Sequence, residues 1–205
     1  MERYETEEQQ VEAIKQFWKD HGAAIIIGAV LGLGGLWGWR YYSESQITSQ
    51  EDASLRYQEA IETLATDDTA KLTQFAKDEE AAGYKTIANL VAAQQAAEEG
   101  DFDAAANHLN TVVSESPDAH IASIASLRLA RVQIEMNQLD AALSTLGEIS
   151  DKAFDAEVQE IKGDIFVRQA KFDDARMAYT SALEKSTSNR LLQMKLDNLA
   201  VAAGA

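Results

Sequence analysis

The sequence predicts an all-α protein in which one N-terminal transmembrane helix precedes an α-solenoid of helical repeats. Three observations predict this fold class. The 205 residues include one proline and are rich in alanine, leucine, glutamate and glutamine, which favours helices over strands. An uncharged apolar stretch lies near the N-terminus. A pattern of small residues and turns recurs along the C-terminal half.

The apolar stretch covers residues 22–39, where 18 consecutive residues carry no charge. At about 1.5 Å per residue it makes roughly 27 Å of helix, enough for a hydrocarbon core of about 30 Å with help from its flanks. All three tryptophans, Trp18, Trp37 and Trp39, lie at the two ends of this stretch, and aromatic rings are typical of membrane interfaces. We therefore expect a transmembrane helix at 22–42, with the lipid bilayer as a partner.

Two other interpretations of this stretch fit less well. A cleaved signal peptide would have a basic start, whereas the first 21 residues contain six acidic side chains against three basic ones. Its one candidate cleavage site, 43–45, lies beyond two tyrosines. A buried core helix of a soluble protein would have no reason to hold every tryptophan at its two ends.

Basic residues beside the span predict its orientation. Lys15 and Lys19 precede the span and Arg40 follows it, a small basic excess on the N-terminal side. This bias places residues 1–21 in the cytoplasm and residues 43–205 outside it. The absence of cysteine fits an oxidising compartment such as the periplasm, and it excludes disulfides, thiolate metal sites and cysteine nucleophiles.

The membrane helix is rich in glycine, and its glycines form two pairs with the spacing small-xxx-small. Glycine is common in membrane helices, but two such pairs in one short span favour a helix that packs against another membrane helix. The residues of this predicted packing site are Gly28, Gly32, Gly34, Gly35 and Gly38.

A short helix is expected before the span. Thr6 and Gln9 fit a capping box, and an apolar stripe that includes Val11 and Phe17 follows at helical spacing. Two interpretations remain open. The segment is either an amphipathic helix on the cytoplasmic membrane face or an extension of the membrane helix, broken near His21 and Gly22.

Beyond the span, apolar spacing predicts one helix at about 51–65, ending at 66–68, and a second at about 70–77. The acidic run 78–80 is expected to be an exposed break. From residue 43 onward there are 28 acidic and 14 basic side chains, in a chain of net charge −16. Such a surface repels phosphate backbones, so no nucleic-acid partner is expected.

The later part of the chain repeats one pattern three times. The segments 100–105, 137–142 and 170–175 each end in alanine, at intervals of 37 and 33 residues. A small residue stands 12 positions before each alanine, a large residue stands four positions after it, and an aromatic residue or leucine follows each turn. The predicted repeat core is Ala93, Phe102, Ala105, Leu109, Ala130, Leu139, Ala142, Leu146, Gly163, Phe172, Ala175 and Tyr179.

This pattern resembles the tetratricopeptide repeat, a helical hairpin with a period of about 34 residues. The residue that ends the first helix favours a left-handed conformation, which Gly100 and Asn137 suit and Ala170 does not. A concave surface in such repeats usually binds peptide or protein, so recognition is the expected function. The repeats are expected at about 86–119, 123–155 and 156–187, with a capping helix at 188–203 started by Ser188 and Asn189.

The sequence holds no constellation of catalytic residues. His21, His108 and His120 are scattered, and His108 is expected on a helix surface. No phosphate-binding glycine loop, HExxH or Gly-x-Ser-x-Gly motif occurs. We therefore expect neither enzyme activity nor a cofactor or metal site.

The segments VEAIKQFWKDHG (11–22), GLWGWRYY (35–42) and LRLARVQ (127–133), together with the acidic N-terminus and degenerate repeats, are similar to the YfgM family of bacterial inner-membrane proteins. The resemblance implies an ancillary subunit of the SecYEG translocon that pairs with a membrane-anchored periplasmic chaperone of the PpiD type. It also implies a periplasmic repeat domain that helps to hand unfolded or translocating polypeptides to chaperones. An alternative function is a tether or regulator of a cytoplasmic signalling protein through the N-terminal segment.

Overall fold

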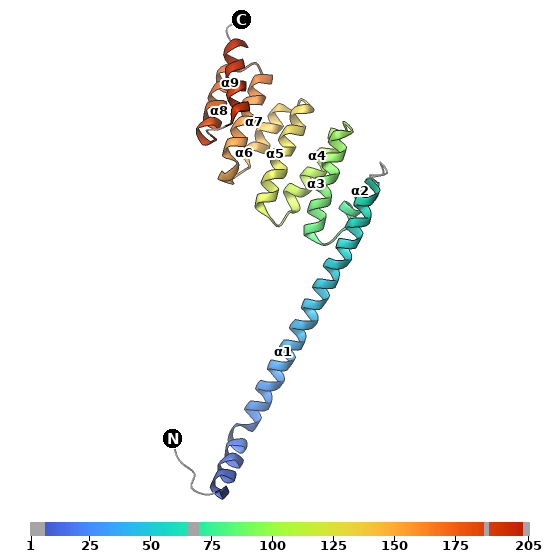
Figure 1. Cartoon of the computed structure of the whole chain (residues 1–205), viewed down its shortest axis with the longest axis vertical. Coiled ribbons are helices and arrows are strands. Elements are labelled where there is room, and N and C mark those ends of the chain that lie inside the picture. Colours follow the sequence, from blue (N-terminus) through green and yellow to red (C-terminus); the bar gives the residue numbers. More distant parts are fainter. Residues whose placement is uncertain (1–6, 65–69, 187–188, 203–205) are drawn as a thin grey trace. The chain divides into compact units, whose positions relative to one another are not determined.

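The computed structural model describes residues 7–64, 70–186 and 189–202, and within these ranges every regular element is a helix. The all-α prediction is confirmed. The chain forms two compact units, Met1–Asp52 and Ala53–Ala205, and we call the second the repeat domain. The helices, labelled in Figure 1, are α1 Glu7–Leu64, α2 Ala70–Asp78, α3 Ala82–Glu98, α4 Phe102–Glu115, α5 Ala119–Glu135, α6 Leu139–Gly147, the 3₁₀ turn η1 Lys152–Phe154, α7 Asp155–Arg168, α8 Phe172–Lys185 and α9 Arg190–Ala202.

The first unit consists of the N-terminal part of α1. In the described part of the chain, α1 is the one helix long and apolar enough to cross a membrane. Its apolar side chains are exposed, with Leu31 at 70% and Trp37 at 73%. A buried core helix of a soluble protein would cover these side chains, so that interpretation does not fit.

α1 runs without a break through His21 and Gly22, so the interruption that belonged to one of the two open interpretations is wrong. The indole of Trp18 lies against Gly22, where an added Cβ would come within 2.8 Å of the ring. Glycine here makes room for the indole without ending the helix. The helix expected from Glu51 is likewise the last part of α1, because no glycine or proline between the span and Glu51 ends it. Thr6 and residues 66–68 lie outside the described residues.

The repeat domain begins with a small cluster in which α1, α2 and α3 meet. Ala60 packs with Leu72, Ala76 and Ala88. The carboxylate of Glu79 lies beside this cluster with its residue only 7% exposed. It pairs with the Arg56 guanidinium at 2.9 Å and accepts a hydrogen bond from the backbone N–H of Ala81 at 2.9 Å. The prediction that the whole acidic run is exposed is therefore wrong at Glu79.

Three helical hairpins follow, α3–α4, α5–α6 and α7–α8, and each packs against the next along the chain (Figure 1). The turn inside each hairpin has the same geometry. Gly100, Asn137 and Ala170 have positive φ of 80°, 58° and 57°. Each turn closes with a pair of backbone bonds of the Schellman type. The bonds that span five residues are Asp101 N to Ala96 O, Gln138 N to Gln133 O and Lys171 N to Phe166 O, at 2.8, 2.8 and 2.9 Å.

The repeating small residues lie where antiparallel helices approach each other. Ala105, Ala142 and Ala175 are fully buried, as is Ala130, and Ala93 is 3% exposed. The large residues one turn further on, Leu109, Leu146 and Tyr179, are 2%, 1% and 3% exposed. The residues that follow the turns, Phe102, Leu139 and Phe172, are only partly buried.

α9 covers the open side of the last hairpin. Its buried residues Leu192 and Leu199 pack with Ala175 and Tyr179 of α8. The side chain of Asn189 caps its first turn by accepting a hydrogen bond from the N–H of Leu192 at 3.1 Å. Ser188, the other predicted cap residue, lies outside the described residues.

Candidate functional site

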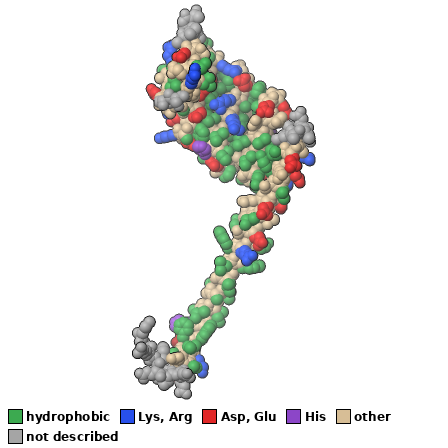
Figure 2. Space-filling model, in the orientation of Figure 1, with side chains coloured by type: hydrophobic (Ala, Val, Ile, Leu, Met, Phe, Trp, Pro, Cys, Tyr) green, Lys and Arg blue, Asp and Glu red, His purple; other side chains and the backbone are tan. Residues whose placement is uncertain are grey.

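A groove runs along the first helices of the three hairpins. It consists of two hollows, of about 320 and 600 Å³, that share Ala97, Arg131 and Val132. α3, α5 and α7 contribute most of its wall, and α9 contributes Lys195. Stacked hairpins place their first helices side by side, and the curvature of the stack forms a binding surface of this kind. Figure 2 shows hydrophobic side chains gathered on one face of the repeat domain, with Lys and Arg side chains among them.

The sequence forms the groove by helical spacing. Leu90 and Ala97 are seven residues apart on α3, and Arg128 and Arg131 are three apart on α5. Residues at these intervals share one face of a helix. The lining is therefore mixed: apolar side chains form its base, and charged side chains stand among them. The charged lining residues are Arg128, Arg131, Glu135, Asp164, Arg168 and Lys195.

Both acidic residues of the lining are paired. Arg168 Nη2 lies 2.7 Å from Glu135 Oε1, and its Nη1 donates to the carbonyl of Ile134 at 3.1 Å. Lys195 Nζ lies 2.8 Å from both carboxylate oxygens of Asp164 and 2.8 Å from Glu160 Oε1. These contacts connect α5 to α7 and α7 to α9, so they stabilise the groove and pair both of its acidic residues, although Lys195 is shared between Asp164 and Glu160.

The Lys195 cluster includes the ring of Tyr179. The phenol donates a hydrogen bond to Asp164 Oδ1 at 2.7 Å, and Lys195 Nζ lies 5.9 Å from the ring centroid. Burial raises the pKa of Tyr179, and the hydrogen bond to Asp164 raises it further. Burial opposes the charge of Lys195, but the hydrogen bonds to Asp164 and Glu160 outweigh it, so the pKa of Lys195 is raised. Both groups keep their protons, and the cluster has a structural role.

Arg128 and Arg131 remain without an acidic partner. Both are exposed, and within the described ranges neither lies within ion-pair distance of a carboxylate. The groove lining therefore includes two arginines that no carboxylate of the described residues pairs with, in a chain whose net charge is −16.

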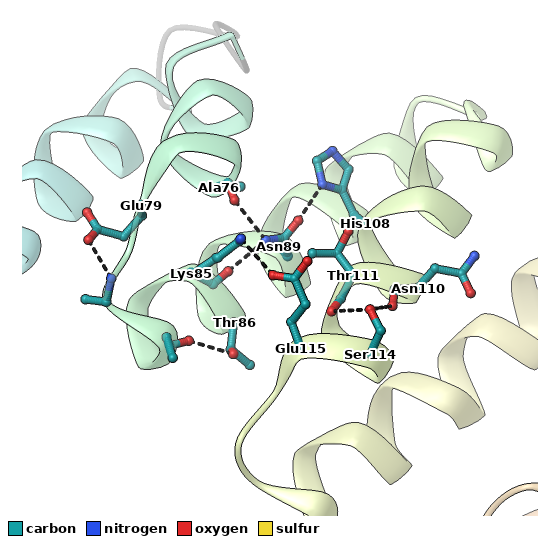
Figure 3. Close-up of polar contacts among 12 residues, drawn as sticks. Ala76, Glu79, Lys85, Thr86, Asn89, His108, Asn110, Thr111, Ser114 and Glu115 are labelled. Carbon is teal, nitrogen blue, oxygen red and sulfur yellow. Dashed lines mark hydrogen bonds and ion pairs between the residues drawn. The ribbon is translucent and has the colours of Figure 1, made fainter.

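Apart from the groove, a separate hollow of about 450 Å³ lies between α2, α3 and α4, whose polar contacts are drawn in Figure 3. The buried Asn89 donates both of its amide hydrogens, to the carbonyls of Ala76 at 3.1 Å and Lys85 at 2.9 Å. Its Oδ1 lies 2.9 Å from His108 Nδ1, so this nitrogen must carry the hydrogen. His108 is half-buried rather than on the surface, and burial lowers its pKa. Because every polar atom of Asn89 is satisfied within the fold, this network is structural.

The structure does not bring the three histidines together. His21 stacks on Phe17 with ring centroids 5.0 Å apart, and His120 Nδ1 lies 2.8 Å from Asp151 Oδ2. In the part of the chain that the structure describes, no three metal-ligating side chains form a cluster.

Among the described residues, no side chain packs against the five glycines of the predicted packing site. A Cβ added to any of the five would meet no atom within 4 Å among the described residues. Close approach of another membrane helix would use this free space. The set is Gly28, Gly32, Gly34, Gly35 and Gly38.

Sequence reasoning predicted a concave surface but did not assign its charged residues. The segment 127–133 contributes to the family resemblance, which assigns no role to its two arginines. A local signal was available, because Arg128 and Arg131 lie on either side of the predicted small residue Ala130. Their lack of acidic partners, however, depends on residues far away in the sequence.

Comparisons with known proteins agree with this architecture. The family model described as a tetratricopeptide repeat-like domain matches residues 15–201. The chain is similar to proteins named ancillary SecYEG translocon subunit. The Escherichia coli protein is 33% identical over 98% of this chain and 100% of its own length. The Haemophilus influenzae protein is 35% identical and the Neisseria gonorrhoeae protein 29%, each over 94% of this chain and 97% of its own length.

Proposed function

The chain belongs to the YfgM family of ancillary SecYEG translocon subunits, and on this premise we propose that it is a membrane-anchored module that binds polypeptides at the SecYEG translocon. Its repeat domain supplies the binding surface, and α1 holds that surface at the membrane. Family membership supports the place of action. The groove along α3, α5 and α7 is the single observation that supports polypeptide binding.

In this proposal the chain crosses the bacterial inner membrane once. Residues 22–42 span the bilayer, residues 1–21 lie in the cytoplasm, and residues 43–205 lie in the periplasm. The exposed apolar side chains of α1 support the anchor, and the basic residues at 15 and 19 support the orientation. The absence of cysteine is compatible with a periplasmic domain.

The partners are the SecYEG channel, a membrane-anchored periplasmic chaperone of the PpiD type, and the polypeptides that emerge from the channel. The repeat domain receives an unfolded segment in the groove and passes it to the chaperone. The face of α1 that carries Gly28, Gly32 and Gly35 packs against a membrane helix of one of these partners. The free space around these glycines supports this docking.

Co-purification tests the proposal. Tagged full-length protein, extracted at native abundance in mild detergent, is expected to bring down channel subunits and the chaperone. Replacing Gly28 and Gly32 by leucine fills the glycine face and should reduce that recovery. Ala23→Leu, on the opposite face of the helix, is the matched control. Recovery of the wild-type protein alone would contradict the translocon association. To test the orientation, a reporter that is active only in the periplasm is fused after Ala205, and a lack of reporter activity would contradict the periplasmic location of the repeat domain.

A further inference from the structure

We propose that the groove prefers polypeptide segments in which acidic residues are interleaved with apolar ones, and that Arg128 and Arg131 bind the acidic side chains. The inference rests on the proposed function, because it assumes that the groove receives polypeptide. It goes further by specifying the chemistry of the segment.

Charge is the first argument. The two acids that line the groove, Glu135 and Asp164, are already paired with Arg168 and Lys195. The two arginines on α5 are exposed and have no carboxylate within ion-pair distance among the described residues. An acidic side chain that enters the groove therefore meets free guanidinium groups and displaces no existing ion pair.

The position of the arginines is the second argument. Arg131 lines both hollows, and Arg128 lines the smaller one. Being three residues apart on one helix face, they lie about 5–6 Å apart at their Cβ atoms, so both can reach the same stretch of a bound segment. Guanidinium groups bind carboxylates through two parallel hydrogen bonds, which is a geometric preference as well as an electrostatic one.

The apolar lining is the third argument. Leu90 and Val132 lie beside the arginines in the smaller hollow, and Val167 contributes to the larger one. A purely acidic segment would leave these side chains without contacts, whereas alternating apolar residues would cover them. The acidic surface of the rest of the domain repels a strongly acidic chain, which also favours a segment that mixes acidic with apolar residues.

Binding of labelled peptides to the full-length protein tests the inference. The protein is held in nanodiscs of zwitterionic lipid, and fluorescence anisotropy follows an extended peptide that alternates leucine with glutamate. Matched peptides carry glutamine or lysine in place of glutamate. The test variant is Arg128→Gln with Arg131→Gln. Its control is Arg176→Gln with Lys152→Gln, which removes two positive charges outside the groove lining.

The glutamate peptide is expected to bind at least about tenfold more tightly than the glutamine peptide, because a guanidinium binds a carboxylate more strongly than it binds a neutral amide. The test variant should lose that preference, the control should keep it, and added salt should reduce it. Arg128→Lys with Arg131→Lys should bind the glutamate peptide at an intermediate level, because lysine keeps the charge but not the paired hydrogen bonds.

Three results would overturn the inference. Equal binding of the glutamate and glutamine peptides would remove the acidic preference and leave polypeptide binding intact. Failure of all three peptides to bind would overturn polypeptide binding as well, while translocon association would still stand on co-purification. Displacement of the glutamate peptide by phosphatidylglycerol vesicles, but not by phosphatidylcholine vesicles, would assign the arginines to lipid headgroups.

Discussion

The ring of Tyr179 lies against the backbone of Gly163. An added Cβ at position 163 would lie 2.3 Å from Cε1 and 2.4 Å from Cδ1 of the tyrosine. In the two earlier hairpins the equivalent positions hold an alanine and a leucine, Ala93 with Leu109 and Ala130 with Leu146. The third hairpin therefore accommodates the larger side chain of Tyr179 on α8 because Gly163 on α7 lacks the methyl group of an alanine.

Gly163→Ala is expected to destabilise the repeat domain by about 2–3 kcal/mol, because the new methyl group overpacks the junction with Tyr179. In a Tyr179→Leu background the same substitution should cost far less, since leucine is the residue that neighbours alanine in the other hairpins. Thermal unfolding of the full chain, followed by circular dichroism, measures the coupling. Gly83→Ala, where a Cβ meets no atom within 4 Å among the described residues, is the control. Equal losses in both backgrounds would contradict the pairing.

Ala170→Gly is expected to stabilise the protein by about 1 kcal/mol. Ala170 has a φ of 57°, a left-handed conformation in which a Cβ is unfavourable. Gly100→Ala should cost a similar amount at the equivalent turn, because its φ is 80° and a Cβ there would meet no atom within 4 Å. The backbone conformation alone then sets both effects. Chemical unfolding of the two variants and the wild type checks the signs, and a loss of stability on Ala170→Gly would contradict the prediction.

Glu79→Ala is expected to lower the unfolding free energy by about 1–3 kcal/mol, since it removes the acceptor of the Ala81 N–H and the partner of Arg56. Glu79→Gln keeps one acceptor oxygen and should cost less. Glu80, its exposed neighbour, provides the control, and Glu80→Ala should change stability by less than about 0.5 kcal/mol. Similar losses at both positions would show that the local charge run, and not the buried contact, matters.

Stability should fall as pH decreases below about 6.5, in part through His108. Burial holds the pKa of His108 below its ordinary value of 6.5 in the folded protein, so the unfolded chain binds the proton more readily. The stability that neutral His108 contributes is fully present above the pKa of this histidine in the unfolded chain. It is lost as pH falls toward the lower pKa of the same histidine in the folded protein. The charged groups around the ring are Lys77, Lys85 and Glu115, of which the last two pair at 2.7 Å.

His108→Gln tests this dependence, because glutamine retains a donor for Asn89 and does not titrate. The pH profile of the variant's melting temperature is expected to be flatter than the wild type's between about pH 7 and 5. His120→Gln provides a comparison at a histidine that pairs with an acid on the surface. Parallel profiles for the wild type and the His108 variant would contradict the assignment.

Much of the architecture follows from local features of the sequence. An uncharged run of 18 residues with tryptophans at its ends can be recognised without the fold, because length and hydropathy decide whether a helix can cross a membrane. The hairpin turns are also local. Gly100 and Asn137 suit the left-handed conformation by residue type, whereas Ala170 does not, and the structure has the same turn at all three.

The errors have physical causes as well. The breaks expected within α1 relied on one glycine and on polar residues, and neither ends a helix unless another conformation is favoured. Glu79 looked exposed because the residues on either side are acidic, but the fold brings Arg56 to it from another helix. Local composition carries no information about such a partner.

The sequence by itself determined the anchor, the helical hairpins and the places where they turn, since each depends on residues close together in the chain. The tertiary structure decided the character of the groove. Arg168 reaches Glu135 over 33 positions and Lys195 reaches Asp164 over 31, and these pairs leave Arg128 and Arg131 as the free charges. Which charges cancel depends on distances in space, and those distances exist only once the hairpins have stacked.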